Sequence, residues 1–336
     1  MSPQVDVSLV VIAYNEATVI TDCLVALRHQ STPRSLEILV VDDGSTDGTR
    51  ALVEQIGTRD VRVRLIAHDH NRGRGASRRT GQDAALGPLI GFVDADVIVP
   101  PDWLERCAAA LGPNGAVSGI ATPDGDCAAL ERILHPVVRV RAHTMAISGG
   151  NVLFDARALR EVGFDERARL GEDFRIARQL AAHGHPIATV PGLLAKHRES
   201  KSYVATIRWM WQNGVDAASL PFEFGIVRAP DLTWLAWIAV LVSLVSLAAT
   251  GVVAWGLALG GTLLCTAAVA VGHTASRFHP RPRTLRWLAA ALLDVPLVSA
   301  YLAGRTWGLP LAVLSARGTS RRPGGILAKA APPGGG

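Results

Sequence analysis

The amino-acid sequence predicts an α/β protein with a doubly wound sheet, followed by transmembrane helices near the C-terminal end. Short apolar runs rich in β-branched residues alternate with helical patterns over residues 7–93, as in sheets whose parallel strands are joined by helices. Acidic and glycine-rich motifs follow several of these runs directly. Residues 232–276 contain no Asp, Glu, Lys or Arg, and an uncharged stretch of this length far exceeds the core helix of a globular domain.

The expected strands lie at residues 7–13, 36–41, 61–67 and 89–93. Helices are expected between them at residues 16–29, 46–56 and 75–86, and a further helix at residues 174–183. Thr46 and Asp47 are candidate caps for the second helix. Ligands of doubly wound sheets bind beyond the carboxyl ends of the strands. The polar motifs after the first, second and fourth strands are therefore candidate binding residues.

The uncharged stretch has room for two membrane spans, because one crossing takes about 20 apolar residues. We expect the spans at residues 232–250 and 252–272, with a turn near Thr250 and Gly251; a buried helical hairpin is the alternative. A third apolar segment, residues 287–309, contains Asp294 and Arg305, so it is either a third span or a re-entrant or interfacial segment. The predicted domains are residues 1–225 (catalytic), 226–315 (membrane, two to three helices) and 316–336 (a disordered basic tail).

The basic composition indicates a membrane surface and not a nucleic acid as the partner. The net charge is +5 and the pI is near 9.4, and the chain has no nucleic-acid-binding signature. Positive charge gathers after the apolar stretch and in the tail, at Arg277, Arg281, Arg283, Arg286, Arg317, Arg321, Arg322 and Lys329. Basic residues beside spans stay on the cytoplasmic side and attract anionic lipid. The four cysteines are scattered, as is typical of proteins in a reducing compartment, and no signal peptide is evident. The first domain is therefore expected in the cytoplasm. Together with the expected spans, this predicts a multi-pass protein of the cell membrane.

Two acidic pairs follow expected strands. Asp42 and Asp43 end the second strand, and Asp94 and Asp96 follow the fourth. Acids at strand ends often only cap the next helix, but alternate acids such as Asp94 and Asp96 can converge on one ion. Carboxylate oxygens suit Mg²⁺ or Mn²⁺ bridging a diphosphate, and such an ion neutralises charge on a departing diphosphate. The second pair therefore predicts a divalent metal site.

A glycine- and arginine-rich segment, residues 71–79, separates the two acidic pairs. Glycine lets a backbone approach a ligand closely, and arginine pairs bidentately with phosphate. A solvated basic loop is the alternative interpretation. A dinucleotide-binding fingerprint is disfavoured, because Gly73 and Gly75 are not followed by the third glycine that it requires.

Two later motifs complete the candidate site. Gly149, Gly150 and Asn151 form one, and Glu172 with Asp173 opens the helix expected after residue 173. Acids at a helix start can simply complement the helix dipole. In a pocket that holds a metal and a phosphate-binding loop, Asp173 could instead be the general base that deprotonates an acceptor hydroxyl.

Taken in order, these motifs resemble family 2 glycosyltransferases over residues 5–210. The matching segments are Ser8–Glu16, Val41–Thr49, Asn71–Gly73, Asp94–Asp96, Gly149–Asn151 and Glu172–Asp173. The resemblance implies a GT-A fold and an inverting single displacement from a nucleotide-diphosphate sugar.

The resemblance also implies a role for individual residues. Donor binding would fall to Tyr14, Glu16, Asp43, Arg74 and Asp94, and the metal to Asp96. Asp173 would be the catalytic base. The acceptor side would be lined by Gly149, Gly150, Asn151, Glu172 and Trp209, and a group in the segment 196–198 would lie near the leaving phosphate.

One departure from the family bears on the product. Members that build long polymers carry Gln-x-x-Arg-Trp after the catalytic acid, and here Arg208 and Trp209 are present while Ala205 occupies the Gln position. This favours addition of a single sugar, to a lipid-linked or other membrane-proximal acceptor. Arg208 and Trp209 could equally belong to an amphipathic helix on the membrane surface. A membrane nucleotidyltransferase and a catalytically silent scaffold remain the alternative functions.

Overall fold

The computed structural model describes residues 5–123, 147–168, 171–198, 202–224, 229–277 and 285–319. The chain forms two compact units. The first contains residues 1–205 and 271–294, and the second contains residues 206–270 and 295–336. The two units divide within a helix, upstream of the boundary at residue 225 expected from the sequence.

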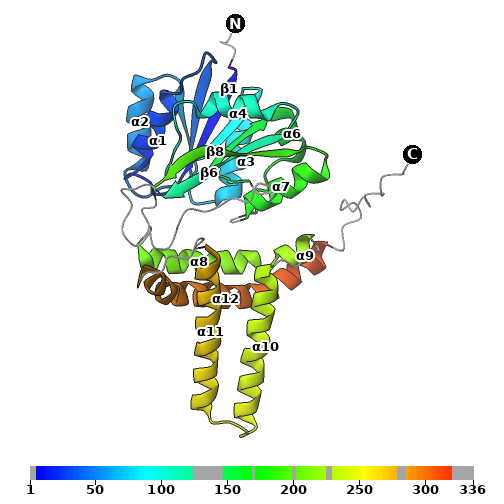
Figure 1. Ribbon diagram of the computed structural model, residues 1–336. Coiled ribbons are helices and arrows are strands. Elements are labelled where there is room, and N and C mark those ends of the chain that lie inside the picture. The colour runs from blue at the N-terminus through cyan, green and yellow to red at the C-terminus, as the bar shows by residue number, and fades with distance from the viewer. Residues whose placement is uncertain are drawn as a thin grey trace, which may run out of the picture. The chain divides into compact units, whose positions relative to one another are not determined.

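The first unit is built on one mixed sheet of eight strands in the order β3-β2-β1-β4-β7-β6-β8-β5 (Figure 1). Its parallel half confirms the four expected strands: β1 (Val7–Ala13), β2 (Leu36–Asp42), β3 (Val63–Ala67) and β4 (Leu89–Asp94). β1 lies between β2 and β4, parallel to both. The acidic ends of β2 and β4 therefore lie at one edge of the sheet, on either side of β1.

The apolar pattern of the sequence does not predict the other four strands of the sheet. They are β5 (Val97–Ile98), β6 (Ala116–Pro123), β7 (Asn151–Asp155) and β8 (Ile187–His197). β7 pairs antiparallel with both β4 and β6, which makes the sheet mixed. In this register Val93 faces Asn151, so the end of β4 meets the start of β7.

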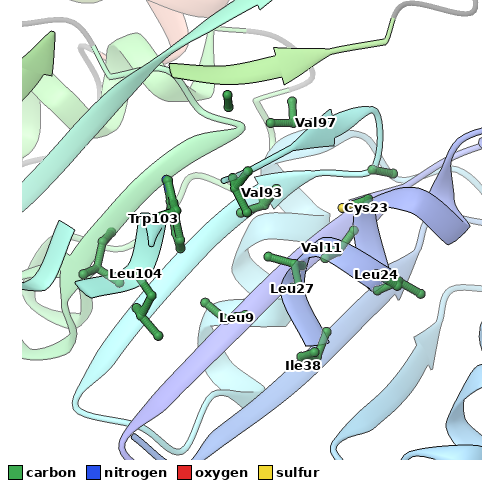
Figure 2. Packing of buried hydrophobic residues seen from close by; sticks show 14 of the residues in the cluster. Leu9, Val11, Cys23, Leu24, Leu27, Ile38, Val93, Val97, Trp103 and Leu104 are labelled. Carbon is green, nitrogen blue, oxygen red and sulfur yellow. The ribbon is translucent and has the colours of Figure 1, made fainter. Parts of the chain in front are cut away.

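Helices cover both faces of the sheet, as a doubly wound fold requires. They are α1 (Ile20–Arg28), α2 (Thr49–Arg59), α3 (Arg74–Ala84), α4 (Trp103–Leu111), α6 (Ala156–Val162) and α7 (Glu172–Ala182). One apolar cluster joins α1 and α4 to the sheet, with Leu9, Val11 and Leu24 buried in it (Figure 2). A second cluster, on the face of Val10, takes residues of α6 and α7.

Two of the expected helices begin three to four residues later than the sequence predicts. α1 begins at Ile20 because residues 14–17 are held in a loop, with Asn15 at φ +58°. α2 begins at Thr49, and Asp47 Oδ1 accepts a hydrogen bond from the Thr49 N–H at 2.9 Å. The loops after β1 and β2 are also joined to each other, since the Glu16 N–H donates to Thr49 Oγ1 and the Ala17 N–H donates to Asp47 Oδ2. Local sequence patterns do not predict these contacts.

The second unit is helical. It contains most of α8 (Tyr203–Ala217), together with α9 (Leu220–Phe224), α10 (Ala229–Ala249), most of α11 (Trp255–Arg277) and the larger part of α12 (Leu285–Thr319). The segments Asp231–Ala249 and Trp255–Gly272 are long and apolar enough to cross a membrane. The turn between them includes Gly251 at φ +75°, where the sequence predicts it. Of the helices in the described residues, these two alone meet that standard.

The third apolar segment belongs to α12, a single helix that contains Pro296 and Pro310. α12 continues to Thr319, four residues into the tail that the sequence predicts to be disordered. The rest of that tail, residues 320–336, lies outside the described residues, as do Arg281 and Arg283 of the basic loop.

Candidate active site at the carboxyl ends of β1, β2 and β4

The loops after β1 and β2 are joined by hydrogen bonds from backbone to side chain. The Asn15 N–H donates to Ser45 Oγ at 2.9 Å, and the Thr46 N–H donates back to Asn15 Oδ1 at 2.8 Å. The Glu16 N–H donates to Thr49 Oγ1 at 2.8 Å. These bonds account for the left-handed conformation of Asn15, which asparagine tolerates better than most residues. Tyr14, immediately before this network, is exposed by 45% and is open to a ligand.

Asp43 connects the end of β2 to the glycine- and arginine-rich segment. Its Oδ1 accepts from the Arg72 N–H at 2.9 Å and its Oδ2 from the Gly73 N–H at 2.8 Å. His68 Nδ1 lies 2.7 Å from Asp43 Oδ1, and His68 Nε2 lies 3.0 Å from Thr80 Oγ1. The carboxylate of Asp43 therefore fixes the backbone that leads into α3.

Arg78 lies at the centre of the candidate site. The side chain extends from α3, is 1% exposed and donates three hydrogen bonds. Nη2 binds Asp94 Oδ1 at 2.9 Å, Nη1 binds the Gly149 carbonyl at 2.8 Å, and Nε binds Glu172 Oε1 at 3.2 Å. One guanidinium thus joins the end of β4, the segment before β7 and the start of α7.

The glycine pair before β7 is required by this packing. A Cβ at Gly149 would lie 2.7 Å from Arg78 Nη2 and 3.5 Å from Asp173 Cβ. A Cβ at Gly150 would lie 2.5 Å from the carboxyl carbon of Asp94. A side chain at Gly149 would therefore displace the guanidinium of Arg78, and a side chain at Gly150 would displace the carboxyl group of Asp94.

The two acids on either side of this backbone have opposite electrostatic environments. Burial alone would raise the pKa of Asp94, but the charges of Arg78 and Arg74 outweigh it and hold that pKa below its usual value. The pKa of Asp173 is raised, first by burial and then by the charge of Glu172, although Arg78 and Arg74 oppose the shift. Arg74 thus lies close enough to act on both acids. The pKa of Asp94 is therefore lowered and that of Asp173 is raised, although both carboxyl groups lie near the same guanidinium.

Asp96 and His197 form a second acidic position beside Asp94. His197 Nε2 lies 3.2 Å from Asp96 Oδ2, and Asp96 Oδ1 is buried with no hydrogen-bond partner among the described residues. A buried carboxylate oxygen without a partner fits a hard divalent cation. The part of the chain that the structure describes has no group of three or more such ligands. Asp96 is therefore a candidate ligand for such an ion.

Two of the expected acceptor-side residues are buried and bind other side chains of the protein. Asn151 is fully buried, and its Oδ1 accepts from Trp103 Nε1 at 2.6 Å. Glu172 is 3% exposed and holds Arg78. Trp209 lies on α8, in the part of that helix that belongs to the second unit, and its acceptor-side role stays a prediction.

Sequence reasoning did not single out Arg78, His68 or Trp103. A signal for Arg78 exists, because Arg74 and Arg78 are four residues apart on α3 and so share one face of the helix. The partners of His68 and Trp103 lie 25 and 48 residues away along the chain, and no local pattern indicates them.

Known proteins resemble the chain in sequence. Residues 8–150 match the family model "Glycosyl transferase family 2". The succinoglycan biosynthesis protein ExoO of Rhizobium meliloti is 35% identical over 55% of this chain and 58% of its own. The glycosyltransferase AglE of Haloferax volcanii is 36% identical over 32% of this chain and 36% of its own. The matches thus cover about a third to somewhat over half of these relatives.

A solved structure resembles the chain over almost its full length. It is the mannosyltransferase PcManGT of Pyrobaculum calidifontis in complex with GDP-Man and Mn²⁺, with a TM-score of 0.54 and 23% identity over 95% of this chain and 87% of that one. At this identity the likeness concerns the fold alone. Together with the described sheet, it leads to one assignment: the chain has the GT-A fold, and residues 8–150 of it match the glycosyl transferase family 2 model.

Proposed function

We propose that the protein transfers one sugar from a nucleotide-diphosphate sugar to a hydroxyl acceptor at the membrane, with inversion at the anomeric carbon. The observation that carries the proposal is the pair Asp94 and Asp173, whose pKa values are shifted in opposite directions on two sides of Arg78. Carboxyl groups whose environments separate their pKa values are the usual arrangement for residues with different chemical roles.

The donor side consists of Tyr14, Glu16, Asp43, Arg74 and Asp94. Tyr14 supplies an exposed ring beside the joined loops after β1 and β2, a suitable surface for a nucleoside. Arg74 begins α3, where its charge and the N-terminus of the helix both favour a diphosphate. The GDP-Man in the complex of PcManGT is of this chemical class.

Asp96 and His197 are the residues that would hold a divalent ion. When bound, Mn²⁺ or Mg²⁺ supplies positive charge that stabilises the leaving diphosphate. Asp94, kept ionised by Arg78, would orient the donor at this position. The buried Oδ1 of Asp96 that has no hydrogen-bond partner supports this assignment.

Asp173 would take the proton from the acceptor hydroxyl. In a single displacement the acceptor oxygen attacks the anomeric carbon while the diphosphate leaves from the opposite face, and the oxygen loses its proton to a nearby base. A carboxyl with a raised pKa is better matched to this transfer than an ordinary one. The Phe174 N–H, which donates to Asp173 Oδ1 at 2.7 Å, orients the carboxylate.

The acceptor is proposed to be lipid-linked or membrane-proximal, with the first unit on the cytoplasmic side. Two candidate spans, α10 and α11, support attachment to a membrane. Nucleotide sugars are made in the cytoplasm, so both ends of such a hairpin would face it.

The decisive experiment measures the product released from a panel of nucleotide sugars by the purified full chain in lipid nanodiscs. Release of free nucleoside diphosphate that depends on an acceptor supports the proposal. Pyrophosphate would indicate a nucleotidyltransferase, and no release with any donor would indicate a silent scaffold. Proton NMR of the glycosidic product should show the anomeric configuration opposite to that of the donor.

The metal assignment has its own test. Chelation should abolish transfer, and Mn²⁺ or Mg²⁺ should restore it. Asp96→Ala should weaken Mn²⁺ binding in the presence of nucleoside diphosphate, measured by the EPR signal of free Mn²⁺, whereas Asp102→Ala on the surface near α4 should leave it unchanged. Full activity in excess chelator would overturn the assignment.

A further inference from the structure

The second unit contains a helix crossing with no room for side chains. A Cβ at Gly214 of α8 would lie 2.1 Å from the Tyr301 carbonyl oxygen of α12. Conversely, a Cβ at Gly304 would lie 2.1 Å from the Trp211 carbonyl oxygen, and one at Gly308 would lie 2.4 Å from that of Val215. Small residues that bring two helix backbones together in this way are typical of helix pairs in and near membranes.

A buried ion pair holds α12 against the beginning of α10. The guanidinium of Arg305 binds Asp231, and both side chains are at most 2% exposed. Arg305 Nη1 also donates to Tyr301 Oη at 3.1 Å, and its guanidinium carbon lies 5.0 Å from the centre of the Trp234 ring. Breaking one partner of such a pair leaves a buried charge, so the contact strongly favours this position of α12.

The ion pair fixes the depth of α12 relative to the hairpin. Asp231 is the first residue of the apolar segment Asp231–Ala249. At about 1.5 Å per residue this segment just matches a hydrocarbon layer of about 30 Å, so Asp231 lies at one edge of that layer. Arg305 must lie at the same edge.

The remaining contacts of α12 are incompatible with a crossing. α8 has 15 residues, with Arg208, Gln212 and Asp216 among them, and is too short and too polar to span. α12 contacts it from Tyr301 to Gly308, within the second half of the third apolar segment. Figure 1 shows α12 running beside α8 and across the direction of α10 and α11.

We infer that α8 and α12 form a helix pair that lies in the plane of the membrane surface, with the lipid bilayer as its partner, and that α12 does not cross. Trp211 and Trp307 belong to this surface: their rings lie 6.5 Å apart, and Trp307 is 68% exposed. Tryptophan concentrates at the level of the lipid headgroups, and helices in this layer bury an apolar side in lipid. The inference rests on the proposed membrane attachment through α10 and α11.

Topology is tested first, with three full-length proteins in sealed vesicles, each carrying one protease-cleavable tag. The tag lies at the N-terminus in the first protein, in the turn at residues 250–254 in the second, and after Gly336 in the third. We expect the two terminal tags on one side and the turn tag on the other. A C-terminal tag on the side of the turn tag would show a third crossing and overturn the inference. All three tags on one side would instead remove the membrane hairpin, and with it the attachment on which the inference depends.

Depth is tested next, by spin labels in variants whose four native cysteines are replaced. A label at Ala300, near the middle of the third apolar segment, should be reached by a water-soluble relaxation agent. A label at Val240, in the middle of α10, should be reached mainly by oxygen dissolved in lipid. Equal depth at the two positions would contradict the in-plane placement. Protection of Ala300 and Trp307 from both agents would indicate a protein and not lipid on this surface, and would also overturn it.

The helix crossing is tested by substitution with a matched control. Gly304→Leu has no space and should increase the mobility of a label at Ala300. Gly260→Leu on α11 adds the same side chain where nothing lies within 4 Å and should not. Equal spectra for the two variants would argue against the crossing. The topology and depth measurements use neither leucine substitution, so they stand even where Gly304→Leu fails to fold.

Discussion

The guanidinium of Arg78 lies near two carboxyl groups, Asp94 and Asp173, whose pKa values are shifted in opposite directions. Arg78 binds Asp94 directly, but it approaches Asp173 only through Glu172 and the Gly149 carbonyl. Its charge therefore stabilises the anion of Asp94 more than that of Asp173. Arg78 is a positioning residue in this arrangement, since it touches the groups around the reaction and not the reacting atoms.

Asp173→Asn should lower turnover by about 10²- to 10⁴-fold, the usual contribution of general-base catalysis. The amide preserves shape but accepts no proton, and the donor is held elsewhere, so donor affinity should stay nearly constant. Turnover and calorimetric donor binding measure the two effects. Asp155→Asn, at the N-terminus of α6 where asparagine caps equally well, is the control. Parental turnover in Asp173→Asn would exclude Asp173 as the base.

The raised pKa of Asp173 gives the activity and the stability opposite dependences on pH. The base works only when ionised, so kcat/KM should rise with pH through a value above the ordinary aspartate pKa of about 3.9. A carboxyl whose pKa is raised by folding stabilises the fold below its unfolded pKa and loses this contribution as pH rises through its folded pKa. Asp173→Asn should therefore melt no lower than the parent at pH 7, a result that thermal unfolding can check.

Arg78→Met should move the acidic limb of the kcat/KM profile to higher pH. Removing the guanidinium takes away a charge that lowers the pKa of Asp173, so ionisation of the base requires a more alkaline solution. Arg78→Lys keeps the charge and should restore much of the profile while losing the three-way hydrogen bonding. If Arg78→Met melts like the parent and the acidic limb of its kcat/KM profile does not move, Arg78 does not set the pKa of Asp173.

At the residue scale, the sequence singles out the acids but not the side chains and backbone groups that they contact. Asp94 and Asp173 stand out because each follows a strand or opens a helix, positions with a known meaning. Arg78 lies in a run of basic residues, and its three partners are 16, 71 and 94 positions away. Only the assembled sheet brings these groups together. From the sequence alone, the basic segment of residues 71–79 is therefore interpreted as a phosphate-binding loop.

At the scale of elements, the start of β7 depends on one buried polar contact. Trp103 of α4 donates to Asn151 at the start of the strand, and both side chains are fully buried. Asn151 Nδ2 has no hydrogen-bond partner among the described residues. The bond from Trp103 to Asn151 Oδ1 therefore helps to fix the start of β7. If it is lost, both the oxygen and the nitrogen of the Asn151 side chain lack a hydrogen-bond partner among the described residues.

Trp103→Phe should destabilise the first unit by about 1–3 kcal/mol, the cost of leaving a buried polar group unpaired. Thermal unfolding of the full chain in detergent measures the loss. Trp255→Phe is a fitting control, because Trp255 is 62% exposed at the start of α11. Equal melting of the two variants would show that the bond to Asn151 contributes little.

The elements that the sequence predicted are those with a strong local pattern. β1, β2 and β4 are short runs of mostly apolar residues, and α10 and α11 contain the uncharged stretch of residues 232–276. β8 runs through Pro191 and Gly192 and ends in Lys196 and His197, so neither alternation nor a continuous apolar run marks it. Its place in the sheet comes from pairing with β6, more than sixty residues earlier.

At the scale of the whole molecule, the basic residues after α11 predict the orientation of the proposed membrane hairpin. A protease-cleavable tag between Arg277 and Arg286 should be cut only from the cytoplasmic side, because clustered arginines resist translocation. Vesicles of known orientation provide the measurement, and a tag in the turn at residues 250–254 is the control for the opposite side. Cleavage from outside intact cells would reverse the proposed orientation.

The antiparallel pairing of β7 with β4 also has a consequence for the order of folding. β1 to β4 are complete once residue 94 has been synthesised, whereas β7 and α7 extend to residue 182. Because chains fold from the N-terminus as they are made, the donor-side loops can form while Asp94 still lacks the backbone of Gly150. In this order the residues proposed to bind the nucleotide would come together first, and Asp173, the proposed base, would join them last. A chain interrupted after β6 would hold the residues proposed to bind the nucleotide without the proposed base.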